Sequence, residues 1–452
     1  MSLTLHDIDR CFMRVLPGVI ATCDRAGMPN VNYVTQIQIV DDRHIALSYQ
    51  FPTKTRLNLE ENPRGSLEVY DPLTLDAYRL ELRLDRIETS GPMFDLLAMR
   101  IEAVASYTGL ANVFRLRAAY VCEVLAIERR AGFLQEELGS PKPRGEPMTE
   151  SRGLRMVSDR ISRARDLDEL LTGTLAALDE VFGFTHSAIL VPEDDGRLVT
   201  IASHGYGATS IGAEIHVGEG LIGVVAKTRT LLRILGLDTN LTYSRQVRAE
   251  LERHNGAPRS KVTAEIPLPG LPDARSQMAI PLVVQDRLLG VIALEARDIV
   301  TFSQWHEPFL QVLANQIASA MTFLEDRDDD DDDEPAPVAP AAGPARTLTY
   351  FKNDDCVFDD DEYLIRNVPA KILWKLLRAF QSEGRTEFSN RELRLDPSLG
   401  LPAIKDNLES RLILLRKRLK QKCPEIRVVP TKRGRFALET QCTLELIERE
   451  TG

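Results

Sequence analysis

Hydrophobic residues recur along the chain at two spacings, and each spacing predicts a different element. Over residues 31–39 every second side chain suits the buried face of a sheet, which is typical of a strand. Over residues 154–181 apolar side chains return every three or four positions, so we expect one long amphipathic helix. The same spacing predicts a helix over residues 304–324, where Thr301 and Gln304 have the separation of a capping box.

Further elements follow from the same patterns in three regions of the chain. The first region has predicted strands over residues 44–49, 66–70, 78–90 and 114–128, with a short helix over 55–62. The middle region has the strand sequences SAILVPED, LVTIASHG, SQMAIPLVVQD and RLLGVIALEA. The last region has predicted strands over 347–351 and 357–358, helices over 370–380, 390–394 and 404–422, and a hairpin that pairs IRVVPT with RFALET.

Two stretches without hydrophobic periodicity separate these regions. Residues 139–150 are rich in Pro, Gly and charge, and residues 327–346 combine an acidic run with a Pro/Ala-rich segment. The predicted domains are residues 1–138, 151–326 and 347–442. We therefore expect a multidomain α+β protein: an antiparallel split β-barrel, an α/β/α domain whose antiparallel sheet has long flanking helices, and a winged helix.

The charge of the chain is strongly segregated. The 452 residues carry a net charge of -11, which by itself argues against nucleic acid as a partner. Residues 411–435, however, contain ten basic residues and a single acidic one, Glu425, while acid is concentrated in residues 325–334. This distribution makes duplex DNA a candidate partner of the last region.

The segments AKILWKLLRAF, SNREL, LESRLILLRKRL and VVPTKRGRFAL resemble the winged-helix effector domain of response regulators. The resemblance implies DNA binding through outward residues of the longer helix and through the hairpin. On that helix, Leu408, Leu412, Leu415 and Leu419 form a stripe that we expect to face the core. The DNA-binding residues expected are Lys405, Asn407, Arg411, Arg416, Arg418, Lys432, Arg433 and Arg435. A basic helix that is solvated or binds a protein is the alternative.

The segments LDEVFGF, SHGYG, IHVGEGLIGVVAKTRT and MAIPLVVQDRLLGVIALEA resemble GAF sensor domains. The resemblance implies a small-molecule pocket over the sheet and dimerisation. The ligand is unknown, and the ligand-binding residues proposed are His204, Tyr206, Glu219 and Arg245. Arg245 belongs to a long insertion over residues 231–272 that we expect to form a lid.

Two other ligands are considered for this middle region. It has no cysteine, which excludes a thioether-linked bilin, and haem would need a histidine such as His204, although a lone histidine is more often a packed residue. The string GEGLIG fits G-x-G-x-x-G, but its flanks lack the parallel β-α-β unit of a dinucleotide site, so we interpret the glycines as a helix start.

The segments GVIATCDRAGMPNVNYVTQIQIVDDRHIALSY and TKTRLNLEENPRGSLEVYD resemble the pyridoxamine phosphate oxidase-like split barrel. Members bind flavin mononucleotide (FMN) at a dimer interface, bind haem, or carry no cofactor, and all three states stay open here. The resemblance assigns the flavin-binding role to Thr53, Lys54, Thr55 and Asn58, because a cation and hydroxyls at a helix start suit a phosphate.

Other features limit the possible functions. No apolar run is long enough to span a bilayer and the first residues do not resemble a signal peptide, so we expect a cytoplasmic protein without membrane contact. The six cysteines are scattered, which favours free, mostly buried thiols over a metal site. The chain lacks the motifs GxSxG, HExxH and GxxxxGK[ST], so no catalytic residue is proposed.

Together these patterns indicate a homodimeric regulator of transcription that responds to a ligand or to redox state. A flavin-dependent oxidoreductase with accessory domains, a haem sensor, and a scaffold whose last domain binds protein are the alternatives.

Overall fold

The structure is a computed structural model of the chain. It describes residues 3–51, 53–111, 113–130, 147–193, 195–206, 210–253, 270–299, 301–302, 306–326, 345–360, 362–401, 408–432 and 434–450. The linker over residues 327–344, with its acidic run, and the predicted DNA-binding residues Lys405, Asn407 and Arg433 lie outside these ranges.

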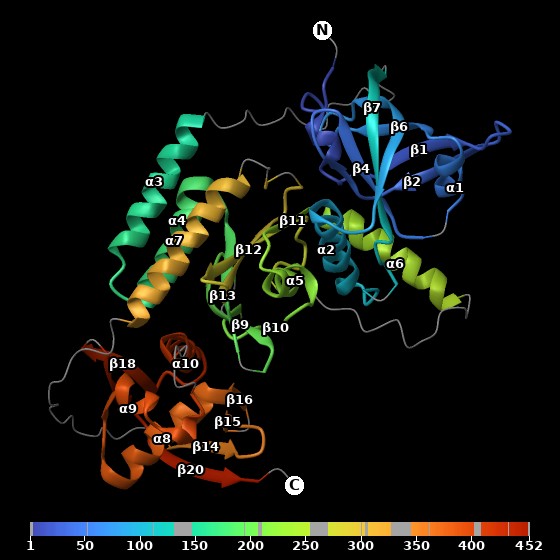
Figure 1. Ribbon diagram of the computed structural model, residues 1–452. Coiled ribbons are helices and arrows are strands. Elements are labelled where there is room, and N and C mark those ends of the chain that lie inside the picture. Colours follow the sequence, from blue (N-terminus) through green and yellow to red (C-terminus); the bar gives the residue numbers. More distant parts are fainter. Residues whose placement is uncertain are drawn as a thin grey trace. The chain divides into compact units, whose positions relative to one another are not determined.

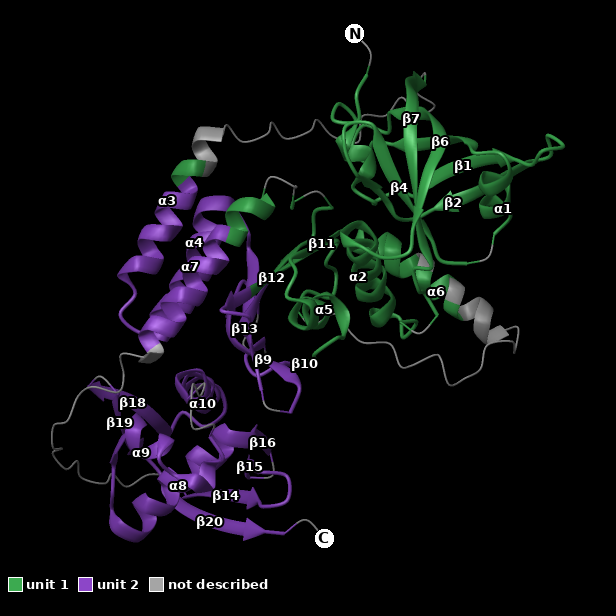
Figure 2. Cartoon of the chain, in the orientation of Figure 1, with its two compact units in different colours: residues 1–152, 215–281, 293–311 green, residues 153–214, 282–292, 312–452 purple. Residues whose placement is uncertain are grey.

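The chain forms two compact units, whose boundaries pass through the middle region (Figure 2). One unit comprises residues 1–152, 215–281 and 293–311. The other comprises residues 153–214, 282–292 and 312–452.

The first unit contains a seven-stranded antiparallel sheet that curls around one core (Figure 1). Its strand order is β2-β1-β5-β6-β7-β4-β3. The strands are β1 (Gly18–Cys23), β2 (Pro29–Val34), β3 (Ile37–Ile39), β4 (His44–Tyr49), β5 (Arg64–Tyr70), β6 (Ala77–Glu88) and β7 (Ala118–Arg130). Alternate side chains such as Ile20, Leu67 and Leu80 point inward and are fully buried, which is the reason for the period of two in the sequence. Helices η1 (Asp9–Phe12), α1 (Lys54–Glu61) and α2 (Pro92–Tyr107) complete this domain.

One expectation for this domain is wrong, and one of its helices was missed. The alternating segment 31–39 is not one strand, because the ladder breaks after Val34 and resumes at Ile37, and the two halves lie at opposite edges of the sheet. The long helix α2 was not predicted. It begins with Pro92 at its first position and buries Leu97, Ile101 and Val104 at helical spacing.

The middle region supplies a six-stranded sheet with order β10-β9-β8-β13-β12-β11. Its strands are β8 (His186–Pro192), β9 (Arg197–His204), β10 (Glu214–His216), β11 (Leu232–Leu235), β12 (Ser276–Val284) and β13 (Arg287–Ala296). Its helices are α3 (Pro147–Arg163), α4 (Leu167–Phe182), α5 (Gly220–Thr228), α6 (Leu237–Arg253) and α7 (His306–Asp326). The predicted lid is therefore wrong for residues 232–253, which form a strand and a helix.

The single long helix expected over residues 154–181 is instead two helices, α3 and α4. Asp166 stops the first and starts the second, since its carboxylate accepts a 2.8 Å hydrogen bond from the amide of Glu169. The Glu169 carboxylate in turn accepts from the amide of Arg165, at 3.0 Å. This arrangement is a variant of the capping box, because Glu169 accepts from Arg165 and not from the N-cap residue Asp166 itself.

The last region forms two small sheets around three helices. Strands β14 (Ala345–Phe351), β15 (Cys356–Asp359), β16 (Glu362–Arg366) and β20 (Thr443–Arg449) make one sheet, in which β14 and β20 run parallel. Strands β17 (Glu387–Ser389), β18 (Ile426–Lys432) and β19 (Arg435–Thr440) make the other. The helices are α8 (Asn367–Glu383), α9 (Asn390–Arg394) and α10 (Leu408–Lys422), with the short η5 (Pro397–Leu399) after α9.

The helix over residues 390–394 and the terminal hairpin are confirmed. Ser389 caps α9 by accepting a hydrogen bond from the amide of Glu392, at 3.2 Å. In the hairpin, β18 pairs with β19 antiparallel, and Phe436 is buried against Phe388. The predicted leucine stripe of α10 is also correct, because all four leucines are buried.

Three further findings concern the described residues as a set. None of the described helices is both long and apolar enough to cross a bilayer. No group of His, Cys, Asp and Glu side chains among them is placed to hold a metal ion. The six cysteines are free thiols, and five of them are buried.

His306, at the start of α7, gives the first prediction. Burial, together with the nearby Arg233 guanidinium, lowers the pKa of His306 to about 4. The unfolded chain, with a histidine pKa of about 6.5, therefore takes up this proton first, so stability falls as the pH is lowered from 6.5 toward 4.

Between pH 6.5 and 5, His306 should cost the wild type up to about 2 kcal/mol in the free energy of unfolding. We expect His306→Gln to abolish this part of the pH dependence, measured by thermal unfolding across that range. His6→Gln is the matched control, because that side chain is largely exposed. Equal pH dependence in wild type and His306→Gln would contradict the prediction.

Candidate functional site

The first candidate site is a pocket of about 160 Å³ in the curled sheet of the first unit. Strands β2 and β4, helix α1 and the start of β7 supply its walls. It is lined by Ile20, Asn32, Tyr33, Val34, Thr35, Leu47, Ser48, Tyr49, Gln50, Phe51, Thr53, Thr55, Arg56, Leu59, Phe114 and Tyr120. The lining combines aromatic rings, hydroxyls and one cation, a composition that suits a planar ligand with an anionic group.

The four predicted flavin-binding residues have different environments. Thr53 lines the pocket at the N-cap position of α1, and Thr55 lines it from a buried position. Thr55 accepts a 2.9 Å hydrogen bond from the Asn30 amide, and Asn58 donates one of 3.2 Å to Thr22. These bonds tie α1 to β1 and β2, so Asn58 positions the helix rather than facing a ligand.

Lys54 is exposed and is not a pocket residue, whereas Arg56 is. The Arg56 guanidinium lies 5.7 Å from the centre of the Tyr49 ring and forms a 2.8 Å ion pair with Glu60. Arg56 lowers the pKa of Glu60, which also accepts a hydrogen bond from the Tyr120 hydroxyl. Sequence reasoning missed Arg56, although its four-residue separation from Glu60 is the spacing of a helical ion pair.

The proposed ligand residues of the middle region belong to both units. His204 Nε2 donates a 2.8 Å hydrogen bond to the Asp179 carboxylate on α4, and Tyr206 packs edge-on against His186. These two lie in the second unit. Glu219 and Arg245 lie in the first, where Glu219 precedes α5 without a side-chain cap and Arg245 is an exposed residue of α6.

The start of α5 is covered by helix α2 of the same unit. The amide of Gly220 donates to Ser106 Oγ at 2.7 Å, and the amide of Leu221 donates to the Tyr107 hydroxyl oxygen at 3.1 Å. The Tyr107 hydroxyl donates to Gln277 Oε1 at 3.0 Å, and Gln277 donates to Glu295. Ser106 and Tyr107 therefore satisfy amides that a ligand anion could otherwise have bound.

Gly220 is required at this contact. It has a φ of 62°, and a Cβ there would come within 2.7 Å of the Tyr107 ring. The G-x-G-x-x-G string is thus the start of a helix, as expected, and its glycines allow close packing.

The basic residues of α10 are not arranged as predicted. Arg411 was expected to point outward but is only 2% exposed, because α10 packs against its own domain on one side and against α4 and β9 on the other. Arg418 donates to the backbone oxygen of Leu364 and lies over the Tyr363 ring, so it is half-buried. Outward orientation is therefore wrong for Arg411 and Arg418.

Lys417 and Arg366 connect the last region to the middle region within the second unit. Lys417 pairs with Asp168 on α4 at 2.7 Å and donates to the backbone oxygen of Ile201 at 3.0 Å. Arg366 pairs with Glu214, which also pairs with Arg197. These contacts cover part of the helix that the sequence assigns to DNA.

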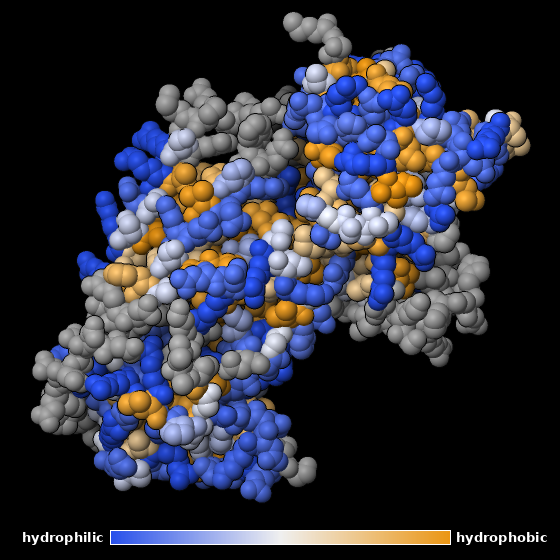
Figure 3. Space-filling view, viewed as in Figure 1, coloured by the Kyte–Doolittle hydropathy of each residue, from blue (hydrophilic) through white to orange (hydrophobic). Residues whose placement is uncertain are grey.

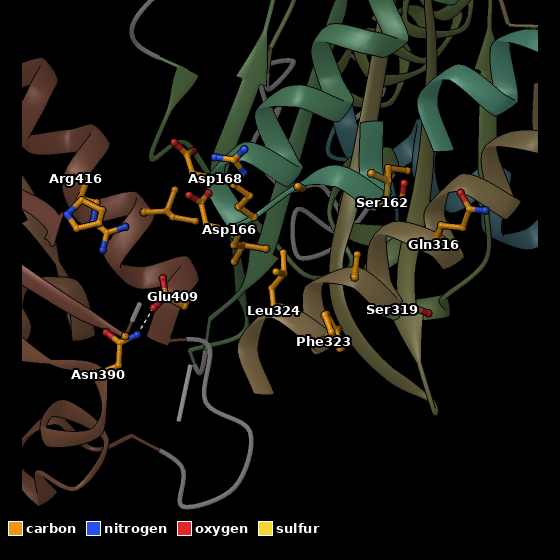
Figure 4. A pocket seen from close by; sticks show the side chains of 18 of the residues that line it. Ser162, Asp166, Asp168, Gln316, Ser319, Phe323, Leu324, Asn390, Glu409 and Arg416 are labelled. Carbon is orange, nitrogen blue, oxygen red and sulfur yellow. Dashed lines mark hydrogen bonds between the residues drawn. The ribbon is translucent and has the colours of Figure 1, made fainter. Parts of the chain in front are cut away.

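A cleft of about 1280 Å³ opens beside this contact (Figure 4). Helices α3, α4 and α7 form one wall and the last region forms the other. Asp166 and Asp168 stand across from Arg416, and Asn390 donates a hydrogen bond to Glu409. Lys432 and Arg435, at the tip of the hairpin, also line the cleft, and Lys432 is exposed.

Comparisons with known proteins assign two of the three regions. The family model of pyridoxamine 5'-phosphate oxidase matches residues 7–124, and the GAF domain model matches residues 164–322. The N-terminal domain is of the pyridoxamine 5'-phosphate oxidase type, and the middle domain is a GAF domain. Comparison with curated proteins gives no significant match.

Solved structures similar to the chain match one domain at a time. The GAF domain of a phosphoenolpyruvate-protein phosphotransferase from Coxiella burnetii is 19% identical, with 40% of this chain and 98% of that chain covered and a TM-score of 0.33. Free methionine-R-sulfoxide reductase from Neisseria meningitidis is 16% identical, with 42% and 98% covered and a TM-score of 0.31. An FMN-binding protein from Syntrophomonas wolfei subsp. wolfei is 19% identical, with 28% and 85% covered and a TM-score of 0.24.

The contact between the oxidase-type domain and the GAF helix α5 gives a prediction. Tyr107→Phe keeps the ring but leaves the Leu221 amide without its acceptor and Gln277 Oε1 without a donor. We expect a loss of about 1–3 kcal/mol in the free energy of unfolding, because these groups are buried.

Thermal unfolding and hydrogen exchange at the Leu221 amide would measure this loss. Tyr33→Phe is the matched control, since Tyr33 is a largely exposed residue. The prediction fails if Tyr107→Phe and Tyr33→Phe have the same midpoint of thermal unfolding and the exchange rate of the Leu221 amide is unchanged.

Proposed function

We propose that the chain is a sensory regulator of transcription, in which the oxidase-type and GAF domains respond to a ligand or to redox state and the last domain binds duplex DNA. The two family matches support the sensory part of this proposal. The DNA-binding part is supported by the composition and order of the last domain.

One observation carries the DNA-binding proposal: a helix, a strand, two further helices and a basic hairpin follow one another in the last domain. These are α8, β17, α9, α10 and the hairpin β18–β19, the order expected of a winged helix. Lys432 is exposed at the hairpin tip, and Arg435 follows it across the turn. Such cations suit the phosphates of a duplex.

The contact between α10 and the GAF domain suggests how DNA binding is regulated. Asp168 and Glu214 form ion pairs with Lys417 and Arg366, so in this structure α10 is held against the GAF domain. A ligand that favours a second arrangement of the sensory domains would release α10, and the shift is limited to the difference in its affinity for the two arrangements.

We expect the double variant Asp168→Asn/Glu214→Gln to bind a duplex about twofold to thirtyfold more tightly, because partly exposed ion pairs are each worth about 0.2–1 kcal/mol. Fluorescence anisotropy of the full chain with a labelled duplex at low ionic strength would measure the change. Lys432→Glu should weaken binding by a similar factor.

Glu180→Gln is the matched control, since it removes a pair with Arg160 away from the last domain. If neither wild type nor the double variant has salt-dependent affinity for duplex DNA, the assignment is overturned.

We also propose that the oxidase-type domain binds FMN in the pocket beside α1. Arg56, Thr53 and Thr55 supply a cation and hydroxyls for the phosphate, and Tyr49 and Tyr120 supply aromatic walls. When bound, FMN would supply hydride and electron transfer.

The size of the pocket favours a site shared between two copies of the chain. Ligand sites of this class occupy about 300–1,000 Å³, which is more than this pocket offers alone. Met28, Val31 and Tyr33 are exposed along β2, the edge strand beside it. Figure 3 shows apolar surface over this domain. A second copy that covers this edge would enlarge the site and form the homodimer.

Arg56→Ala should weaken FMN binding at least tenfold, whereas Lys54→Ala should change it less than twofold, because charge-assisted hydrogen bonds from a guanidinium to a phosphate are together worth more than about 1.4 kcal/mol. Titration of the apoprotein, followed by flavin absorption and fluorescence, would measure both. Equal losses of FMN affinity in the two variants would show that Lys54 also contacts the phosphate. If the wild type does not bind FMN, the flavin proposal is overturned.

A further inference from the structure

Three arginine side chains of the first unit lie close enough to influence one another electrostatically, outside the pocket described above. Arg14 follows η1, Arg100 belongs to α2, and Arg233 belongs to β11 of the GAF domain. Arg100 is 8% exposed and Arg233 is 7% exposed. Arg14 has a φ of 61°, a left-handed conformation that is costly for a residue with a Cβ.

Hydrogen bonds bring Arg14 and Arg100 together, and Arg233 is bonded separately beside them. Arg14 Nη1 and Arg100 Nη1 donate to the same oxygen, Gln38 Oε1, at 2.8 and 2.6 Å. Arg233 Nε donates to Glu307 at 2.8 Å, and its Nη1 donates to the backbone oxygen of Phe302. Two guanidinium groups therefore share one neutral acceptor, while the third has a carboxylate.

The positive charge of this cluster is not balanced. Among the residues that the structure describes, no carboxylate lies within 4.0 Å of the guanidinium of Arg14 or Arg100. The Nε of Arg100 is buried and has no hydrogen-bond acceptor there. A buried charge is costly unless it is paired, and arginine does not escape this cost by losing its proton.

Neighbouring groups respond to the same positive potential. Burial, opposed by Glu307 and assisted by Arg233, lowers the pKa of Arg100 to about 10, and burial and the other two arginines lower that of Arg14. The pKa of His306 is lowered by burial and by Arg233, so that ring stays neutral and adds no charge at neutral pH. An anion at the cluster would reverse each of these effects.

We propose that Arg14, Arg100 and Arg233 form a binding site for a small oxyanion, either inorganic phosphate or the carboxylate of a metabolite. Planar guanidinium groups donate pairs of hydrogen bonds to such oxygens, and Arg100 Nε supplies a free donor. The site joins η1 and α2 of the oxidase-type domain to β11 and the start of α7. A bound anion therefore stabilises the contact between the two sensory domains.

The test uses the full chain in a buffer of low anion content. Inorganic phosphate, sulfate, acetate and chloride are each titrated while thermal unfolding is followed. For a site that binds only the folded chain, we expect the preferred oxyanion to raise the midpoint by about 5 °C near a hundredfold excess over Kd. A larger increase in the midpoint with phosphate than with acetate indicates a phosphate site, and the reverse indicates a site for a carboxylate.

Arg100→Met removes one charge and keeps most of the packing. We expect this variant to lose the oxyanion-dependent shift. Without added anion it should unfold at no lower temperature than wild type, because removal of the Arg100 charge relieves repulsion from the other two arginines. Arg25→Gln, an exposed arginine of the same domain, is the matched control and should keep the shift. Arg56→Ala should keep it too, which separates this site from the flavin pocket.

Two outcomes would overturn the proposal. One is the absence of any oxyanion-dependent stabilisation of wild type. The other is an equal loss of stability in Arg100→Met at every anion concentration, which is the result expected of a purely structural arginine. Arg14→Gln, measured in the same way, decides the question if Arg100→Met does not fold.

Discussion

The structure depends on how polar groups are satisfied where the oxidase-type domain meets the start of the GAF helix α5. Backbone amides at a helix start have no partner within the helix, and burial makes each unsatisfied one costly. Here Ser106 and Tyr107 supply the acceptors for Gly220 and Leu221, and Gln277 extends the bonds to Glu295. A complete network holds the domains in one arrangement. The arginine cluster differs, because Arg100 Nε is buried and has no acceptor among the described residues.

The two sensory domains are coupled physically through α2. Thr35, Gln50 and Phe114 line both the barrel pocket and a small cavity of about 30 Å³ that Ile101 and Val104 of α2 also line. A ligand in the pocket would therefore lie one layer of side chains from α2. Since the last residues of α2 bond to α5, a shift of this helix changes the contacts of both domains together.

Local patterns predicted much of the fold, because they report on a single element and its exposure. Alternation located β4 at its observed bounds, and Ser389 marked the start of α9 through its own hydrogen bond. The break between β2 and β3 and the division of α3 from α4 were missed, since periodicity continues across both. The second of these had a readable sign, the Asp166 and Glu169 spacing of a capping box.

The candidate sites were harder to predict than the fold. Lys54 and Arg56 both stand in the first turn of α1, and which of them faces the pocket depends on how the helix is rotated against β1 and β2. Arg411 shows the same limit: an arginine on a basic helix suggests solvent, yet distant segments bury it. The buried cluster joins residues 14, 100 and 233, which no motif connects. Residue type and spacing cannot supply such information, because it arises from tertiary contacts.

The parallel pairing of β14 with β20 affects how the last domain assembles. The sheet is completed only when Thr443–Arg449 docks beside Ala345–Phe351. This pairing can form only after about a hundred further residues have been synthesised. Pairing between segments so far apart in sequence slows folding. Until synthesis has passed Arg449, the nascent domain would therefore expose the edge of β14 that β20 later covers, and exposed strand edges favour aggregation.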